Sequence, residues 1–233
     1  MNMLFQSIMN NNKLFGDNMK SYRAIRHDII RAKQASNSDE LHHPNQKINQ
    51  IYNFLKSKNL KILELFAGQG NLSKHYKKFG IVESYDKKYL KSGDSFLNVY
   101  NLIYNKNVYD VIDIDPYGFP NRFFPHIFLL IENGYIFLTM PKPSVNILNG
   151  ITRTHLISYF DNHNPNINQI INQIVTWGLC HWRKVEILDI LDLKSIYRIA
   201  LRVKKVKSTD YTGVKNRSEL TLKNTIKQTK LWT

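Results

Sequence analysis

The stretch LELFAGQGNLSKHY, residues 63–76, joins an apolar run to a glycine turn and then to a helical pattern. The chain has only ten glycines, and two of them, Gly68 and Gly70, lie in this turn. Glycine accepts positive φ and has no side chain to block the approach of a ligand to the backbone. The stretch therefore predicts a strand, a tight turn and a helix, with a ligand close to the turn. A lone Gly-x-Gly is also typical of βα turns that are merely tight.

The same strand-and-helix pattern continues on both sides of this turn. Strands are predicted at 61–66, 81–85, 109–114 and 135–140, and helices at 46–56, 71–79, 95–104 and 123–131. Strands that alternate with helices indicate a parallel sheet with helices on both faces. Two β-rich runs, 185–193 and 195–206, predict a closing antiparallel hairpin. We therefore expect a Rossmann-like α/β fold: a central, mostly parallel seven-stranded sheet with helices on both faces and a C-terminal antiparallel hairpin.

The chain length and composition favour one main domain with two basic appendages. The 233 residues divide into an N-terminal basic helical extension (1–45), a main domain (46–207) and a basic C-terminal tail (208–233). The sequence lacks an apolar run long enough to cross a membrane, so we expect no membrane partner. The single cysteine, Cys180, is expected to be a buried small residue. One cysteine forms no internal disulfide and fits a reducing, cytoplasmic location.

The net charge favours a polyanionic partner. The chain has 33 basic and 18 acidic residues, a formal net charge of +15. A basic surface of this kind is typical of proteins that bind nucleic acid. An AT-rich coding sequence would also raise the lysine content, but it would not by itself remove Asp and Glu. We predict phosphate contacts from Arg23, Arg26 and Arg31 on a basic helix at 21–34.

Acidic residues follow the predicted strands where a nucleoside ligand would need them. Glu64, within the first strand, can face the ligand side of the glycine turn. Asp86 ends the second strand, where it can accept hydrogen bonds from two ribose hydroxyls. The third glycine of a dinucleotide fingerprint is replaced by Ser73. A nucleoside without a pyrophosphate, such as S-adenosylmethionine, therefore fits better than a dinucleotide.

The segment GDSF, residues 93–96, offers a second contact to the same nucleoside. Asp94 can bind the adenine amino group while Phe96 grips the ring. Asp94 fits equally well as the N-cap of the helix predicted at 95–104. Both interpretations remain open from the sequence.

The stretch DVIDIDPYGFP, residues 110–120, carries the predicted chemistry. Because proline cannot continue a central strand, the chain must leave the sheet at Pro116. Asp115 then lies at the carboxyl edge, beside the glycine turn. The Asp115 carboxylate and the Pro116 carbonyl can accept hydrogens from an exocyclic amine while Tyr117 or Phe119 stacks on the base. The same residues also fit a plain β-turn with proline second and Gly118 fourth.

Residues 46–206 resemble class I S-adenosylmethionine-dependent methyltransferases. Four stretches carry the resemblance, in this order: ELFAGQG, YD at 85–86, GDSF and DIDPYG. Within the amino-methyltransferase branch, DIDPYGFPNRFFPHIFLLIENGYIFLT (113–139) is closest to the tRNA guanine-N2 dimethyltransferases. It has DPYG where many nucleic-acid amino-methyltransferases have DPPY. The tRNA family is also longer, with a substantial C-terminal domain.

The resemblance implies methyl transfer from S-adenosyl-L-methionine to an exocyclic amino nitrogen of a base, guanine N2 in tRNA or other RNA, or adenine N6 in DNA. The alternative is a catalytically inactive fold that serves as a nucleic-acid-binding or accessory subunit. The implied catalytic residues are Asp115, Pro116 and Tyr117. The implied cofactor-binding residues are Glu64, Phe66, Ala67, Gly68, Gly70, Asp86, Asp94, Ser95 and Phe96. The implied substrate-binding residues are Gly118, Phe119, Arg23, Arg26 and Arg31. The expected partner is nucleic acid, a protein partner is left open, and no metal is expected because the histidines are scattered.

Overall fold

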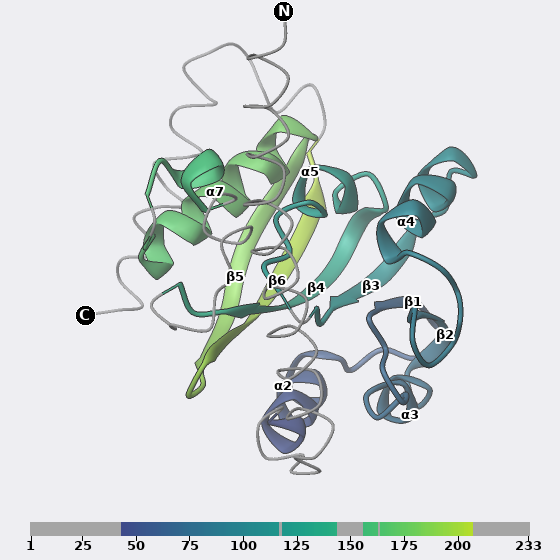
Figure 1. Ribbon diagram of the computed structural model, residues 1–233. Coiled ribbons are helices and arrows are strands. Elements are labelled where there is room, and N and C mark those ends of the chain that lie inside the picture. The colour runs from purple at the N-terminus through teal and green to yellow at the C-terminus, as the bar shows by residue number, and fades with distance from the viewer. Residues whose placement is uncertain (1–42, 117, 144–155, 163, 207–233) are drawn as a thin grey trace, which may run out of the picture. The chain divides into compact units, whose positions relative to one another are not determined.

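The computed structural model describes residues 43–116, 118–143, 156–162 and 164–206 (Figure 1). The predicted basic extension with Arg23, Arg26 and Arg31, the predicted tail and Tyr117 lie outside the described residues. The helices are α2 (Pro44–Phe54), α3 (Ser73–Tyr76), α4 (Ser95–Tyr104), α5 (Phe124–Ile127) and α7 (Ile167–Cys180). The strands are β1 (Leu60–Leu65), β2 (Gly80–Tyr85), β3 (Tyr109–Ile114), β4 (Ile131–Pro141), β5 (Arg183–Asp192) and β6 (Ile196–Lys205).

The strands form one mixed sheet in the order β2-β1-β3-β4-β6-β5. Strand β1 pairs in parallel with β2 and β3, and β3 pairs in parallel with β4. Strand β6 is antiparallel to both β4 and β5. The α/β architecture agrees with the alternation of strands and helices in the sequence, and the last two strands pair antiparallel as expected.

The sheet has six strands among the described residues, not the predicted seven. The missing strand would lie between β2 and α4, in the short segment 86–94. There the Asp86 carboxylate accepts hydrogen bonds from the backbone nitrogens of Lys88 and Tyr89, both at 2.8 Å. The backbone nitrogen of Asp86 in turn lies 2.8 Å from the Ser92 hydroxyl. This local turn leads directly into α4 and leaves β2 at the edge of the sheet.

The two faces of the sheet carry different helices, because side chains alternate along a strand. One face packs apolar residues such as Leu65, Ile112 and Leu138 against α4, α5 and α7. The other face packs Ile62, Phe137 and their neighbours against α2 and α3, which Figure 1 shows below the sheet. Near the carboxyl ends of the strands, this second face becomes polar and charged.

Strand β4 begins earlier than the sequence predicted and includes Asn133-Gly134. The pairing register shifts here, from Tyr109 opposite Ile131 to Val111 opposite Tyr135. A Cβ on Gly134 would lie 1.9 Å from the backbone oxygen of Asp110. Glycine is therefore required here, because β3 and β4 approach too closely for a side chain where their pairing is irregular.

The end of α7 contradicts one expectation: Cys180 is exposed, not buried. The helix turns a different set of residues to the core, so its last position faces solvent. These residues are Ile170, Ile171, Ile174, Val175, Gly178 and Leu179. In the part of the chain that the structure describes, no helix has both the length and the apolar character that a membrane span needs. The same part has no group of three or more His, Cys, Asp or Glu side chains placed to hold a metal ion.

Candidate active site

The glycine turn after β1 has an unusual backbone. Phe66, Gly68 and Gly70 all have positive φ, of 65°, 56° and 77°. Positive φ is rare for a bulky residue such as Phe66, and such outliers concentrate at functional sites. A Cβ added to Gly68 would meet no atom within 4 Å. The backbone conformation, rather than crowding, thus favours glycine at 68, and space remains open beside the turn.

Hydrogen bonds connect the ends of three neighbouring strands. The backbone nitrogen of Ala67 donates to the Tyr85 carbonyl at 3.0 Å, and that of Gly68 donates to the Asp86 carboxylate at 3.0 Å. The backbone nitrogen of Asp115 donates to the Leu65 carbonyl at 3.3 Å. The predicted segments after β1, β2 and β3 therefore meet at one edge of the sheet.

The Asp86 carboxylate is buried and already engaged. Only 6% of the residue is exposed, and the backbone nitrogens of Gly68, Lys88 and Tyr89 all donate to it. A carboxylate has about four acceptor positions. The predicted pair of ribose hydrogen bonds therefore requires some of these backbone contacts to open.

The fourth predicted segment joins the site through aromatic contacts. The Phe96 and Phe66 rings both lie edge-on to Phe123, at centroid distances of 5.6 and 5.4 Å. The Arg122 guanidinium lies 4.2 Å from the centroid of the Phe96 ring, within the range of a cation–π contact. An adenine that stacks on this face of Phe96 would have to displace Arg122.

Asp94 takes the structural role that the sequence left open. It is the exposed N-cap of α4, and its carboxylate accepts a hydrogen bond from the Phe96 backbone nitrogen at 2.8 Å. Ser95, the first residue of the helix, is 4% exposed. The N-cap hydrogen bond accounts for Asp94 without a ligand.

The segment after β3 is only partly available to a substrate. Pro116 and Gly118 are half-buried. Phe119 is 9% exposed, and its ring lies 6.3 Å from Phe124 and 5.9 Å from Phe160. We predicted Phe119 as a residue that stacks on the base, but in this structure it belongs to the core.

Asp115 forms a partly buried ion pair with Lys47 of α2, a residue that the sequence did not single out. The Lys47 ammonium lies 2.8 Å from Oδ1 and 2.6 Å from Oδ2 of Asp115. The Lys47 side chain is 4% exposed and that of Asp115 is 24% exposed. Burial opposes ionisation of Asp115, but the positive charges of Lys47 and Arg198 outweigh it and lower the pKa of this carboxyl below its ordinary value. Asp115 is therefore a carboxylate at neutral pH.

A second buried ion pair lies behind the first. The Arg198 guanidinium of β6 binds both Asp113 oxygens, at 2.8 and 2.6 Å, and neither side chain is exposed. Arg198 also donates to the Thr139 hydroxyl at 2.9 Å, and the Tyr76 hydroxyl donates to Asp113 at 2.5 Å. Burial opposes the charge of Arg198, but Asp113 raises the pKa of the guanidinium, so it stays charged. These residues form a buried polar layer beneath Asp115.

Glu64 lies beneath the glycine turn instead of facing the ligand side. It is 2% exposed, and its Oε2 accepts hydrogen bonds from the Ser73 hydroxyl and, at 3.0 Å, from the Ser84 hydroxyl. Burial raises the pKa of Glu64 to about 7, and the charges of Asp113 and Asp115 act in the same direction. The Ser73 that interrupts the glycine fingerprint thus has a partner within the fold.

Replacing Glu64 with glutamine is expected to remove a pH dependence of stability. The folded-state pKa is raised above the unfolded value, so folding favours the protonated acid. This contribution is complete below the unfolded pKa of 4.5 and is lost as pH rises toward 7. Between pH 5 and 8 the free energy of unfolding should fall by about 2–3 kcal/mol more in the wild type than in Glu64→Gln. Urea unfolding at both pH values measures this. The prediction is wrong if the free energy of unfolding changes by the same amount between pH 5 and 8 in the two proteins.

The buried charges had a signal in the sequence. Lys47 precedes Ile51 by four residues and Leu55 by eight, which places it on the apolar stripe of α2. Arg198 and Asp113 each interrupt an apolar strand run. Charged residues at core positions are almost always paired when buried, and such a check would have selected all three.

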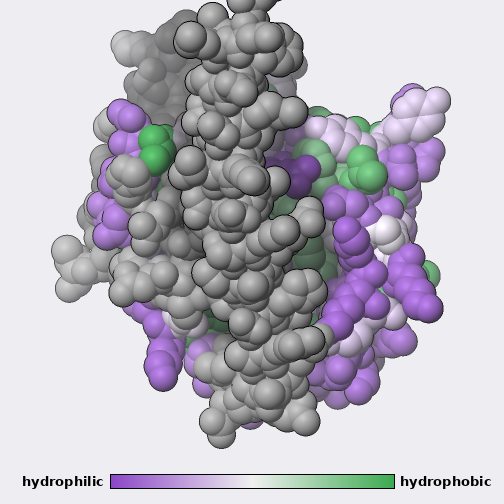
Figure 2. Space-filling view, in the orientation of Figure 1, coloured by the Kyte–Doolittle hydropathy of each residue, from purple (hydrophilic) through white to green (hydrophobic). Residues whose placement is uncertain are grey.

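Exposed lysines are frequent in the stretch that holds β1, the glycine turn and β2. Between residues 56 and 91 there are three acids: Glu64 and Asp86 are buried, and Glu83 accepts hydrogen bonds from the hydroxyls of Tyr85 and Tyr109. The exposed lysines of this stretch are Lys56, Lys58, Lys74, Lys77, Lys78, Lys87, Lys88 and Lys91. Figure 2 shows hydrophilic residues over the side of the molecule that holds α3 and β2. The exposed surface of this stretch is therefore positive.

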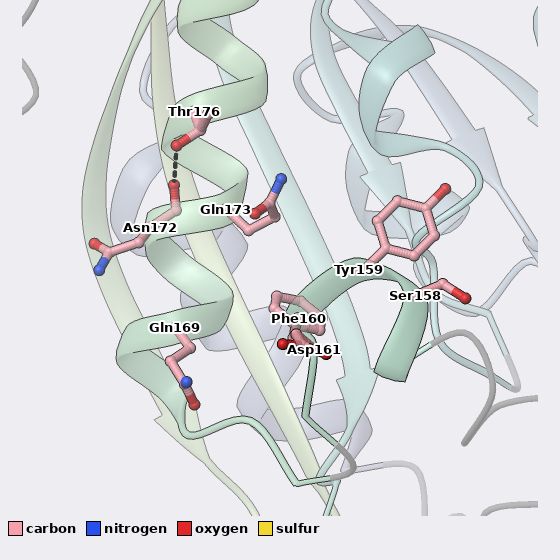
Figure 3. A pocket seen from close by; sticks show the side chains of 8 residues that line it. All are labelled: Ser158, Tyr159, Phe160, Asp161, Gln169, Asn172, Gln173 and Thr176. Carbon is pink, nitrogen blue, oxygen red and sulfur yellow. Dashed lines mark hydrogen bonds between the residues drawn. The ribbon is translucent and has the colours of Figure 1, made fainter.

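A separate depression lies elsewhere, between α7 and residues 158–161. It has a volume of about 400 Å³, and its floor includes Gln169, Asn172 and Gln173 (Figure 3). The Thr176 hydroxyl beside it donates to the Asn172 carbonyl at 2.8 Å. None of the residues predicted for catalysis or cofactor binding lines this depression.

The fold resembles solved methyltransferase structures at low sequence identity. Trm1 from Pyrococcus horikoshii, in complex with S-adenosyl-L-methionine, is 12% identical, with a TM-score of 0.49 over 70% of this chain and 56% of that one. A proposed SAM-dependent methyltransferase from Streptococcus mutans is 14% identical, with a TM-score of 0.49 over 67% of this chain and 48% of that one. Trm5b from Pyrococcus abyssi is 16% identical, with a TM-score of 0.46 over 68% of this chain and 48% of that one.

These comparisons concern the fold alone. The chain spans about half the length of each of these three proteins. No protein-family model matches the sequence, and no curated protein matches it.

Proposed function

We propose that this chain is an S-adenosylmethionine-dependent methyltransferase that modifies an exocyclic amino nitrogen of a nucleic-acid base. The observation that carries the proposal is the position of Asp115. It is an ionised, partly exposed carboxylate at the carboxyl end of β3, hydrogen-bonded through its backbone to the end of β1. In open α/β sheets, ligands bind at this edge.

The glycine turn fits the proposed cofactor. The space beside Gly68 is open. Phe66 has a positive φ, a strained conformation that is found most often at functional sites. Residues 66–70 would lie against the methionine part, with Asp86 and Phe96 nearest the adenosine. S-adenosyl-L-methionine supplies an electrophilic methyl group on a sulfonium when bound.

The protein contributes orientation more than covalent chemistry. Asp115 and the Pro116 carbonyl accept the hydrogens of the acceptor amine and thereby aim its lone pair toward the glycine turn. Fixing two reactants in line supplies much of the acceleration of such transfers. Because Asp115 is a weak base, it acts as a hydrogen-bond acceptor and not as a proton acceptor.

Nucleic acid is the proposed substrate because of the charge of the chain. Eight exposed lysines lie in the stretch 56–91, which includes the glycine turn, and a basic surface attracts phosphates. A base within a duplex must leave its stack to reach Asp115. With Phe119 in the core, Tyr117 is the residue that we propose to stack on it.

A catalytically inactive accessory subunit is the second candidate, and two observations favour it. Lys47 contacts both oxygens of Asp115, and three backbone nitrogens already bind Asp86. Both acids would then serve the fold. An accessory subunit would bind nucleic acid without turnover and with little affinity for the cofactor.

One experiment separates the two candidates. The purified protein is incubated with S-adenosylmethionine that carries a labelled methyl group and, in separate reactions, with total tRNA, rRNA or unmethylated DNA. Each nucleic acid is then digested, and the labelled nucleoside is identified. We expect label on an exocyclic amine of a purine. Binding to the nucleic acids without label in any of them would favour the accessory subunit.

A further inference from the structure

Lys47 is placed where it controls the proposed acceptor of the amine. It lies on the face of α2 that packs on the sheet, and its ammonium is the nearest charge to both oxygens of Asp115, at 2.8 and 2.6 Å. The Lys47 residue is 3% exposed, so the pair is shielded from water on the lysine side. The more exposed side of the pair is the carboxylate, which lies at the sheet edge.

The geometry leaves Asp115 able to bind one more donor. Each carboxylate oxygen has about two acceptor positions, and Lys47 takes about one on each. The Thr139 side chain also hydrogen-bonds to Asp115, which leaves about one position for an N–H group of the amine. An ammonium that contacts both oxygens also restricts rotation of the carboxylate about its Cβ–Cγ bond.

Other charged groups face Asp115 from the elements packed around it. Arg198 of β6 lowers its pKa together with Lys47, and Glu64 of β1 is coupled to it with the opposite effect. Asp113, on the same strand, is neutralised by Arg198 and hydrogen-bonded by Tyr76 of α3. Lys47 is therefore the one direct ion-pair partner of Asp115 among the described residues.

We infer that Lys47 is a positioning residue, whose ammonium holds Asp115 as a fixed, ionised acceptor so that the amine is oriented but not deprotonated before transfer. This inference rests on the proposed function. In the step, the bond between the sulfonium sulfur and the methyl carbon breaks and its electron pair stays on sulfur, which becomes a thioether. The amine lone pair forms the new N–C bond. The methylated nitrogen then releases its proton to water.

A purely structural Lys47 makes a different prediction. It would support the packing of α2, and its loss would lower activity by the same factor at every pH. If Lys47 positions Asp115, its loss raises the pKa of Asp115, because burial is then opposed only by the charge of Arg198 and the hydrogen bond from Thr139. Activity should then fall selectively at acid pH.

The test compares Lys47→Met, Lys47→Arg and the control Lys61→Met. Lys61 is half-buried on β1 and donates to Asn107 at 2.9 Å, without contact to Asp115. We expect the acid limb of kcat/KM to move up by about one pH unit or more in Lys47→Met. It should return toward the wild-type position in Lys47→Arg and stay unchanged in Lys61→Met.

A second readout does not depend on turnover. The protein is labelled with ¹³C at the aspartate carboxyl carbons, the Asp115 signal is assigned with Asp115→Asn, and its titration is followed by NMR. We expect the wild-type Asp115 to remain mostly ionised at about pH 4, near the midpoint of an ordinary aspartate. A wild-type midpoint above about pH 4, or a signal that titrates identically in Lys47→Met, overturns the inference. If the wild type methylates no nucleic acid, the proposed function fails, and the carboxyl titration still decides what Lys47 does to Asp115.

Discussion

Asp115→Asn is expected to lower kcat for methyl transfer about 100- to 1,000-fold, while the Kd for S-adenosylmethionine changes less than about threefold. The amide replaces one carboxylate oxygen with an N–H donor, which repels the hydrogens of the acceptor amine and misaligns its lone pair. Losing a preorganised electrostatic contact at a reacting centre has effects of this size. The glycine turn keeps its contacts to Asp86, so cofactor affinity should survive. Single-turnover kinetics and calorimetry measure the two quantities.

Asp110→Asn is the matched control for this prediction. Asp110 lies on the same strand at its opposite end, where its carboxylate accepts a hydrogen bond from the Lys61 backbone nitrogen at 2.8 Å. The amide oxygen of asparagine can keep that bond, so turnover should stay within about twofold of the wild type. Should Asp115→Asn retain full activity, Asp115 does not hold the amine, and the proposed mechanism is wrong.

Arg198→Met is expected to destabilise the fold by about 3–5 kcal/mol. The substitution keeps most of the buried aliphatic volume but leaves the Asp113 carboxylate without its counter-charge at a position with no exposed surface. An uncompensated buried charge has a cost of this size. Urea unfolding at neutral pH, followed by circular dichroism, gives the free energy of unfolding directly.

Two further variants locate the source of that loss. The first is Arg202→Met. Arg202 lies four residues after Arg198 on β6, on the same face of the sheet. It is half-buried, and among the hydrogen bonds described its guanidinium contacts only the Tyr135 hydroxyl, at 3.3 Å. The substitution should change stability by less than about 1 kcal/mol. Adding Asp113→Asn to Arg198→Met removes the unpaired buried charge of Asp113 and should recover most of the lost free energy of unfolding. A double variant no more stable than Arg198→Met would assign the loss to packing instead of charge.

The two substitutions test different layers of one polar cluster. Asp115 is partly exposed at the sheet edge. Asp113 lies two residues earlier, on β3, and its partner Arg198 lies on β6, and neither side chain is exposed. The inner pair supports the outer one, because Arg198 also contributes to the charge state of Asp115. Loss of a direct contact to the acceptor amine is therefore expected only for the outer layer.

Local features of the site were readable from the sequence. The strand DVIDI matches β3 (Tyr109–Ile114), because it is a short apolar run that a proline ends. Helix α4 begins at Ser95 with Asp94 as its cap, one of the two roles that the sequence left open. The convergence of the segments after β1, β2 and β3 follows from parallel pairing, which aligns their carboxyl ends at one edge.

Three predictions were wrong because the contacts that a side chain makes in the fold are not evident from the sequence pattern. Phe119 looked like an exposed aromatic beside the site, but Phe124 and Phe160 enclose it. Glu64 looked like a ligand-facing acid, but Ser73 and Ser84 claim its carboxyl. The predicted seventh strand is absent from the described residues. The Asp86 side chain binds the backbone nitrogens of the next turn, and the residues left before α4 are too few to form a strand.

The sequence by itself determined the alternation of strands and helices, the positive-φ glycine turn and the position of Asp115 at a strand end, because these depend on φ preferences and on side-chain periodicity within a few residues. Only the tertiary structure decided the electrostatics of the site. Lys47 is 68 positions from Asp115, and Arg198 is 85 positions from Asp113. The ionisation of a buried acid depends on charges within a few ångströms, and folding alone brings those charges together.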